Sequence, residues 1–205
     1  DDTHLSVEGI RKVSVADIRV ARAWGYRIKL VAQARRVPDG RILQMVAPTL
    51  VAEALPLAQV DGVLNAVAME ADPVGRSFVS GRGAGAGPTA SAVVADILDE
   101  ISKRYELPFS KPVSDLSVAP KAGFPDLVGR FYVRVTGHSP AEMPEIKERL
   151  ISALQTAGIA LDRILVTEEA SACEVMGLTA ETSGASVLAA MAGFPDKSVM
   201  PVMGL

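Results

Sequence analysis

A proline-rich segment in the second half of the chain divides it into two parts that we expect to fold as separate domains. The stretch ELPFSKPVSDLSVAPKAGFPD, residues 106–126, carries four prolines and shows neither a helical nor a strand period. Proline has no backbone N–H to donate, so a regular helix or central strand is disfavoured there. The sequence therefore predicts a first domain over 1–105, an extended linker over 106–128 and a second domain over 129–205.

The first domain begins with a helix and continues as strands. Ser14 is a typical N-cap, Asp17 stands three residues later as in a capping box, and Gly25 suits the helix end. Four strand-like runs follow, at 26–35, 42–51, 62–70 and 75–81. The first and last pairs are joined by short links of hairpin length, so the pattern favours a mainly antiparallel sheet over a βαβ series.

A glycine-rich turn then leads into an amphipathic helix. The stretch SGRGAGAGPTASAVVADILDE, residues 80–100, places Gly81, Gly83 and Ala86 at the spacing G-x-G-x-x-G/A. Proline suits the first helical position, so we expect the helix to open at Pro88. It has an apolar stripe that must pack on something: Ala90, Val93, Val94, Ile97, Leu98 and Ile101.

The residues alone leave two interpretations of this turn. In one, backbone N–H groups approach a nucleotide phosphate at the positive end of the helix. In the other, the turn only brings a strand into a helix. A complete dinucleotide fold requires a further parallel strand and an acidic residue about 20 positions later. Here the helix runs into the proline-rich segment instead, which favours the structural interpretation.

The second domain reads strand, helix, strand, strand, helix, strand. The first strand is RFYVRVTG, and its helix has Ser139 as the expected N-cap, Glu142 as the capping-box partner and Gly158 as the stop. Two strands around residues 169–170 suit a hairpin, and a helix over 183–193 precedes a last strand. This is the βαββαβ, ferredoxin-like order. The fold class is therefore α+β, with antiparallel sheets in both domains.

Composition excludes several classes of function. One cysteine, Cys173, and two isolated histidines, His4 and His138, predict no internal disulfide and no metal site. A net charge of −3 without a basic cluster argues against nucleic acid as a partner. No run of residues is apolar enough for a membrane span, and the first residues lack signal-peptide features, so we expect a cytoplasmic protein. No cluster of side chains predicts a catalytic centre.

Five blocks of the first domain resemble one enzyme family. VEGI at 7–10, DIRVARAWGYRIKLVAQARR at 17–36, APTLV at 47–51, PLAQVDGVLNAV at 56–67 and GRGAGAGPTASAVVADI at 81–97 are similar to the C-terminal half of homoserine dehydrogenase. The remainder resembles the ACT domain that bacterial members carry at their C-terminus.

The resemblance implies a function and a cofactor. The family interconverts aspartate 4-semialdehyde and homoserine with NAD(P)H, on the route to threonine, methionine and isoleucine. A glycine of the turn lies near the nicotinamide nucleotide, so cofactor contact carries over to Gly81, Gly83 and Gly85. The helix after the turn would pack on a nucleotide-binding domain, and the sheet would contribute to a homodimer.

The resemblance also implies what this chain does not itself supply. The family's nucleotide fingerprint and its catalytic lysine lie upstream of the position equivalent to Asp1, so we expect no catalytic residue here, no tight cofactor binding and no activity of this chain alone. ACT domains bind amino-acid effectors at a turn that usually reads Pro-Gly, where this chain has Pro140 and Ala141. The alternative is a non-enzymatic ACT module that binds an amino acid or dimerises.

Overall fold

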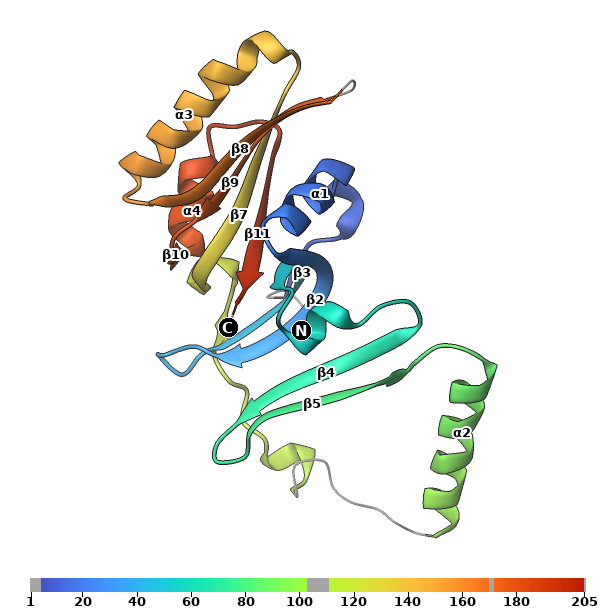
Figure 1. Cartoon of the computed structure of the whole chain (residues 1–205). Helices are drawn as coiled ribbons and strands as arrows, with labels where there is room; N and C mark the ends of the chain where they lie inside the picture. The colour runs from blue at the N-terminus through green and yellow to red at the C-terminus, as the bar shows by residue number, and fades with distance from the viewer. Residues whose placement is uncertain (1–4, 103–110, 170–171, 205) are drawn as a thin grey trace. The chain divides into compact units, whose positions relative to one another are not determined.

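The computed structural model describes residues 5–102, 111–169 and 172–204. Contacts divide the chain into two compact units, one made of residues 1–58 with 119–205 and the other of residues 59–118. Each unit is described by itself below (Figure 1). No helix among the described residues is long and apolar enough to span a membrane.

The larger unit starts with a capped helix and a long hairpin. After β1 (Ser6–Val7), α1 (Val15–Ala23) begins at the predicted cap, where the Ser14 hydroxyl accepts from the Asp17 amide and the Asp17 carboxylate accepts from the Ser14 amide. Gly25, with φ of 85°, turns the chain into β2 (Tyr26–Arg36). This strand pairs antiparallel with β3 (Ile42–Ala52) along its whole length, which confirms the first predicted hairpin.

The C-terminal part of the same unit has the predicted βαββαβ order. It comprises β7 (Val128–Gly137), α3 (Met143–Thr156), β8 (Leu161–Glu169), β9 (Ala172–Thr179), α4 (Gly184–Met191) and β11 (Lys197–Met203). The strands lie in the order β11-β7-β9-β8 with antiparallel neighbours, and a two-residue strand, β10 (Thr182–Ser183), pairs with β7.

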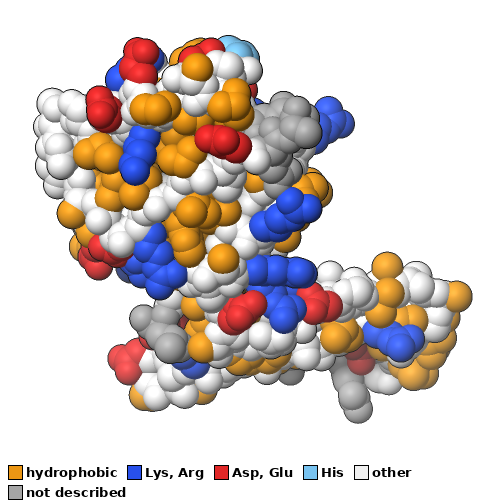
Figure 2. Space-filling view, turned by 45° about the horizontal axis from the view of Figure 1, so that its top comes forward, with side chains coloured by type: hydrophobic (Ala, Val, Ile, Leu, Met, Phe, Trp, Pro, Cys, Tyr) orange, Lys and Arg blue, Asp and Glu red, His pale blue; other side chains and the backbone are white. Residues whose placement is uncertain are grey.

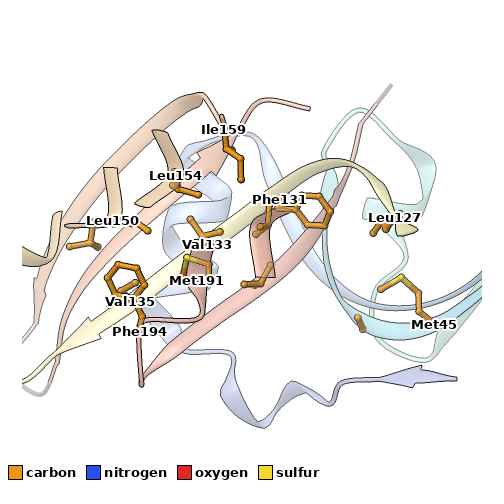
Figure 3. Close-up of a cluster of buried hydrophobic side chains, with 14 of the residues drawn as sticks. Met45, Leu127, Phe131, Val133, Val135, Leu150, Leu154, Ile159, Met191 and Phe194 are labelled. Atoms are coloured by element: carbon orange, nitrogen blue, oxygen red, sulfur yellow. The ribbon is translucent and has the colours of Figure 1, made fainter. Parts of the chain in front are cut away.

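One buried cluster of the larger unit lies between this sheet and its two helices (Figure 3), and another joins α1 to the sheet through residues such as Val20, Tyr132 and Met176. The stripes of α3 and α4 supply Leu150, Leu154 and Met191, and none of these side chains is exposed to solvent. They pack on the inward-facing residues of β7, where Phe131 and Val133 are also fully buried. Strand alternation and helical period thus place one apolar face of each element in a common core.

The two halves of the larger unit share one sheet. Strand β11 pairs in parallel with β3 at Val202 opposite Leu50 and Met203 opposite Val51. The segment predicted as an extended linker also takes part, because β6 (Lys121–Ala122) pairs with β3 and is followed by a 3-10 turn, Phe124–Asp126. Contacts therefore divide the chain differently from the boundaries at 105 and 129, and the domain assignment stays a prediction.

The smaller unit is a hairpin followed by a helix. Strands β4 (Leu64–Ala71) and β5 (Gly75–Arg82) pair antiparallel across a turn that contains a cis peptide bond before Pro73. They form a separate two-stranded sheet, so the four strands predicted for the first domain do not share one sheet. Helix α2 (Ala86–Ile101) begins two residues before the predicted Pro88. None of the residues described in these three elements is buried.

The start of α3 differs from the prediction. A 3-10 turn, Pro140–Glu142, precedes the α-helix, so Ser139 caps this turn and makes no side-chain bond to a backbone N–H. The Glu142 carboxylate instead accepts from the His138 amide and from the Ser139 hydroxyl. These bonds, the amide bond foremost, lower the pKa of Glu142. The capping box predicted between Ser139 and Glu142 is therefore absent.

Candidate functional site

The glycine turn connects β5 to α2 within three residues. Gly81 is the penultimate residue of β5 and pairs with Asn65 of β4, while Gly83 and Gly85 lie between the strand and the helix. Gly85 is the N-cap of α2 and has φ of 119°, a conformation that residues with a side chain rarely adopt. The structure thus brings the three predicted residues together in one exposed turn.

The backbone of Gly83 in this turn lies close to the side chain of Asn65. A Cβ atom added to Gly83 would lie 2.2 Å from the side-chain nitrogen of Asn65, so an alanine there would require Asn65 to move. Asn65 and Arg82 flank the turn, and sequence reasoning assigned a role to neither. Arg82 lies inside the motif GRGAGAG, and a cation next to a possible phosphate site could have been identified from the sequence as a candidate binding residue.

The N-terminus of α2 has the electrostatics that an anion requires. The first N–H groups of a helix have no partner within the helix, and the helix dipole makes this end positive. Gly85 offers no side chain to cap them, and the first turn holds no acidic residue. The exposed N–H groups can therefore donate hydrogen bonds to the oxygens of a phosphate or a carboxamide. The turn supplies no acid, base or nucleophile of its own.

Helix α2 presents its apolar stripe to solvent. Between half and three quarters of each of five side chains is exposed: Val93 51%, Val94 54%, Ile97 52%, Leu98 56% and Ile101 73%. Side chains of this kind gather on the surface in Figure 2. A contiguous stripe of this size on one helix is typical of an interaction surface.

A cluster of polar side chains is buried in the larger unit, and the sequence analysis did not predict it. The Asp17 carboxylate, fully buried, accepts from the Tyr132 hydroxyl at 2.5 Å and from the Arg134 guanidinium at 2.6 Å. Arg134 also lies 3.2 Å from the Glu174 carboxylate and donates to the Lys12 carbonyl. Burial, together with the Asp17 charge, raises the pKa of the Tyr132 hydroxyl, which therefore stays a proton donor.

This cluster holds the N-terminal segment to the βαββαβ sheet. Asp17 lies on α1, Tyr132 and Arg134 on β7, and Glu174 on β9. The cluster has almost no solvent access, with Arg134 only 7% exposed at its side chain, and its carboxylates, the Tyr132 hydroxyl and the terminal nitrogens of Arg134 face other protein groups, while Arg134 Nε is buried without a hydrogen-bond partner among the described residues. It is therefore a structural connection rather than a site for substrate. Capping, the role predicted for Asp17, is only part of what this residue does.

Other titratable side chains lie in separate elements. Cys173 is buried in β9. Glu70 pairs with Arg76 at the surface, and Lys29 lies on β2 opposite Thr49. Within the described ranges, no group of histidine, cysteine and acidic side chains could hold a metal ion.

Comparison with known proteins places these features in a family. Residues 2–98 match the family model described as homoserine dehydrogenase. The homoserine dehydrogenase of Synechocystis is 38% identical over 173 residues, covering 78% of this chain and 39% of the relative. That of Neisseria gonorrhoeae is 48% identical over 114 residues, covering 56% of this chain and 26% of the relative. The chain thus spans about two fifths or less of the length of these curated relatives.

Solved structures match over nearly the whole chain. A homoserine dehydrogenase from Thiobacillus denitrificans superposes with a TM-score of 0.78 at 29% identity, covering 98% of this chain and 48% of that protein. A homoserine dehydrogenase from S. aureus gives a TM-score of 0.62 at 25% identity and covers 97% of this chain. The family match includes the glycine turn and ends inside α2, near the C-terminal end of that helix. On these grounds the chain belongs to the homoserine dehydrogenase family.

Proposed function

We propose that this chain is part of an NAD(P)H-dependent homoserine dehydrogenase, which interconverts aspartate 4-semialdehyde and homoserine in the biosynthesis of threonine, methionine and isoleucine. The observation that carries the proposal is the family match over residues 2–98, which includes the glycine turn and most of its helix. In the complete enzyme, the turn at Gly81, Gly83 and Gly85 contacts the nicotinamide nucleotide. The exposed N–H groups at the start of α2 suit that role.

The apolar stripe of α2 then has a partner in the nucleotide-binding domain. Five large apolar side chains on this helix are at least half exposed, and burying them stabilises a domain contact by about 25 cal/mol per Å² of apolar surface. The chain alone is inactive, because it contributes one wall of the cofactor site and no catalytic group. A homodimer formed through the sheet, and amino-acid feedback through an ACT domain at 129–205, complete the proposal.

Chimeric enzymes test the role of the turn. The N-terminal part of the Synechocystis relative is joined to this chain, and reduction of aspartate 4-semialdehyde is followed by the absorbance of NADPH. We expect activity in the chimera and none in the 205-residue chain alone. Gly83→Val should raise the KM for NADPH at least about tenfold, since its side chain displaces Asn65 and narrows the approach of a nucleotide.

Gly87→Ala is the matched control. Gly87 lies in the first turn of α2, and a Cβ atom added there meets nothing within 4 Å. This change should leave the KM for NADPH unaltered. If Gly83→Val and Gly87→Ala gave the same kinetics, the turn would not contact the nucleotide. Activity of the chain by itself at the rate of the chimera would contradict the proposal that it lacks the catalytic groups.

The alternative, a non-enzymatic module that binds an amino acid, is favoured by one observation: the βαββαβ part supplies most of the buried core between the sheet and α3 and α4, to which β3 adds Leu43, Met45 and Ala47. Calorimetry of the chain with threonine, together with the chimera assay, separates the two. Binding of threonine with no activity in any chimera would favour the module.

A further inference from the structure

Asn65 lies within strand β4, although asparagine is disfavoured in strands. A strand favours side chains that fit a pleated, half-buried surface, and a short polar amide gains little from such packing. The Asn65 side chain is exposed, and in the part of the chain that the structure describes its amide has no hydrogen-bond partner. Its two N–H donors and its carbonyl oxygen are therefore available to a ligand.

Two glycines of the turn leave room beside this amide. Asn65 pairs with Gly81 across the β4-β5 hairpin, so the two residues lie on the same face of the sheet (Figure 1). A Cβ atom added to Gly81 would meet nothing within 4 Å, whereas one added to Gly83 would collide with the Asn65 side chain. The Asn65 amide thus reaches the glycine turn, and the space over Gly81 next to it is open.

The face of the hairpin that carries Asn65 is uncharged and partly apolar. Strand alternation places the charged side chains of the paired residues on the other face: Glu70, Arg76 and Arg82. On the face of Asn65, the neighbouring pair is Val67 with Val79, and these side chains are 59% and 62% exposed. A phosphate or a carboxylate favours a cation, and the paired residues of this face supply none. A flat, uncharged ring that carries an amide matches both the valine pair and Asn65.

We propose that Asn65 binds the carboxamide of the reduced nicotinamide ring and so fixes the orientation of the ring at the glycine turn. Each of the two amides has N–H donors and a carbonyl acceptor, so they can exchange a pair of hydrogen bonds. Val67 and Val79 offer apolar surface to the ring. This inference rests on the proposed function, in which the nucleotide reaches the turn, and it adds the side chain that recognises the carboxamide.

Cofactor binding by the chimeric enzyme, which contains the whole 205-residue chain, tests this inference without turnover. Calorimetry measures the Kd of NADPH and of its reduced 3-acetylpyridine analogue, in which a methyl group replaces the amide nitrogen of the carboxamide. The unaltered chimera should bind NADPH at least about threefold more tightly than the analogue, because the analogue loses one hydrogen bond. Asn65→Leu removes both bonds, so it should weaken NADPH binding about tenfold and abolish the preference for NADPH over the analogue.

A second variant and a control complete the test. Asn65→Asp keeps the size and polarity of the side chain, so it decides the matter if circular dichroism shows that Asn65→Leu is unfolded. Its carboxylate accepts from the carboxamide nitrogen but repels a carbonyl oxygen, so the preference for NADPH over the analogue should increase. Ser80→Ala removes an exposed hydroxyl from the opposite face, where Ser80 pairs with Ala66, and should bind both cofactors like the unaltered chimera.

The outcomes separate this inference from the proposed function. If folded Asn65→Leu bound NADPH as Ser80→Ala does, Asn65 would not contact the cofactor. If it weakened NADPH and the analogue by the same factor, Asn65 would only support the glycine turn. Either result in a chimera that reduces aspartate 4-semialdehyde overturns this inference and leaves the proposed function intact. A folded, unaltered chimera that bound no NADPH would refute both.

Discussion

Replacing Arg134 by methionine should destabilise the larger unit strongly. The guanidinium is the cation for two buried carboxylates, Asp17 at 2.6 Å and Glu174 at 3.2 Å. Their side chains are 0% and 6% exposed, so water cannot replace the lost partner without opening the structure. Removing one member of a buried ion pair costs about 3–5 kcal/mol, because an uncompensated charge stays buried.

The loss should be visible as both a lower Tm and a lower urea midpoint. For a chain of this size, 1 kcal/mol corresponds to roughly 2–4 °C, so 3–5 kcal/mol predicts a fall in Tm of roughly 6–20 °C. The urea midpoint should fall without a change in slope, since the surface exposed on unfolding is nearly the same. Added salt should restore little, because buried pairs are screened much less than exposed ones.

Arg163→Met is the matched control for this prediction. Arg163 donates to the Trp24 carbonyl at 3.1 Å in an exposed position, so its replacement should change stability by less than about 0.5 kcal/mol. A double-mutant cycle with Asp17→Asn then isolates the pair, because Asp17→Asn should cost less when Arg134 is already absent. If Arg134→Met cost less than about 1 kcal/mol, water would reach the cluster and the argument from burial would fail.

Three further variants probe other parts of the chain. Gly184→Ala should destabilise by about 1–3 kcal/mol, since its Cβ would lie 2.1 Å from the Phe124 carbonyl oxygen, and thermal unfolding measures this. Arg41 contacts Asp39 and Asp126, whose carboxyl pKa values its hydrogen bonds help to hold below the usual range. A lowered folded pKa stabilises above the unfolded pKa near 3.8, so Arg41→Met should be less stable than the unaltered chain at pH 7, with the difference disappearing as the pH falls below that value. Ile97→Glu should leave the chain's own Tm nearly unchanged, as this side chain is 52% exposed, but should reduce the activity of the chimera.

Sequence motifs predicted helix starts well where the stabilising hydrogen bonds join residues that are close in sequence. The Ser14 and Asp17 pair specifies a helix start by itself, because both hydrogen bonds of the capping box span three residues. The start of α2 was misplaced by two residues for a related reason. None of the first N–H groups of a helix has an intrahelical partner, so Pro88 is tolerated in the first turn without fixing which residue begins it.

Long-range partners could not be predicted in the same way. The Asp17 carboxylate meets Arg134 across 117 positions of sequence, and an arginine in an alternating strand gives no indication of which acid it will face. The sequence also gives no indication that β11 pairs with β3, because the apolar faces of two strands do not determine which of their edges form hydrogen bonds with each other. For the glycine turn, the sequence predicted the position of all three residues, but their spacing alone left open whether a nucleotide phosphate binds there or the turn is only structural.

Strand β3 is where these features meet. Its edge receives both β1 and β11, so it joins the N-terminal segment to the βαββαβ part. Along the chain, β3 is followed by residues 56–59 and then by β4, whose hairpin partner carries the glycine turn.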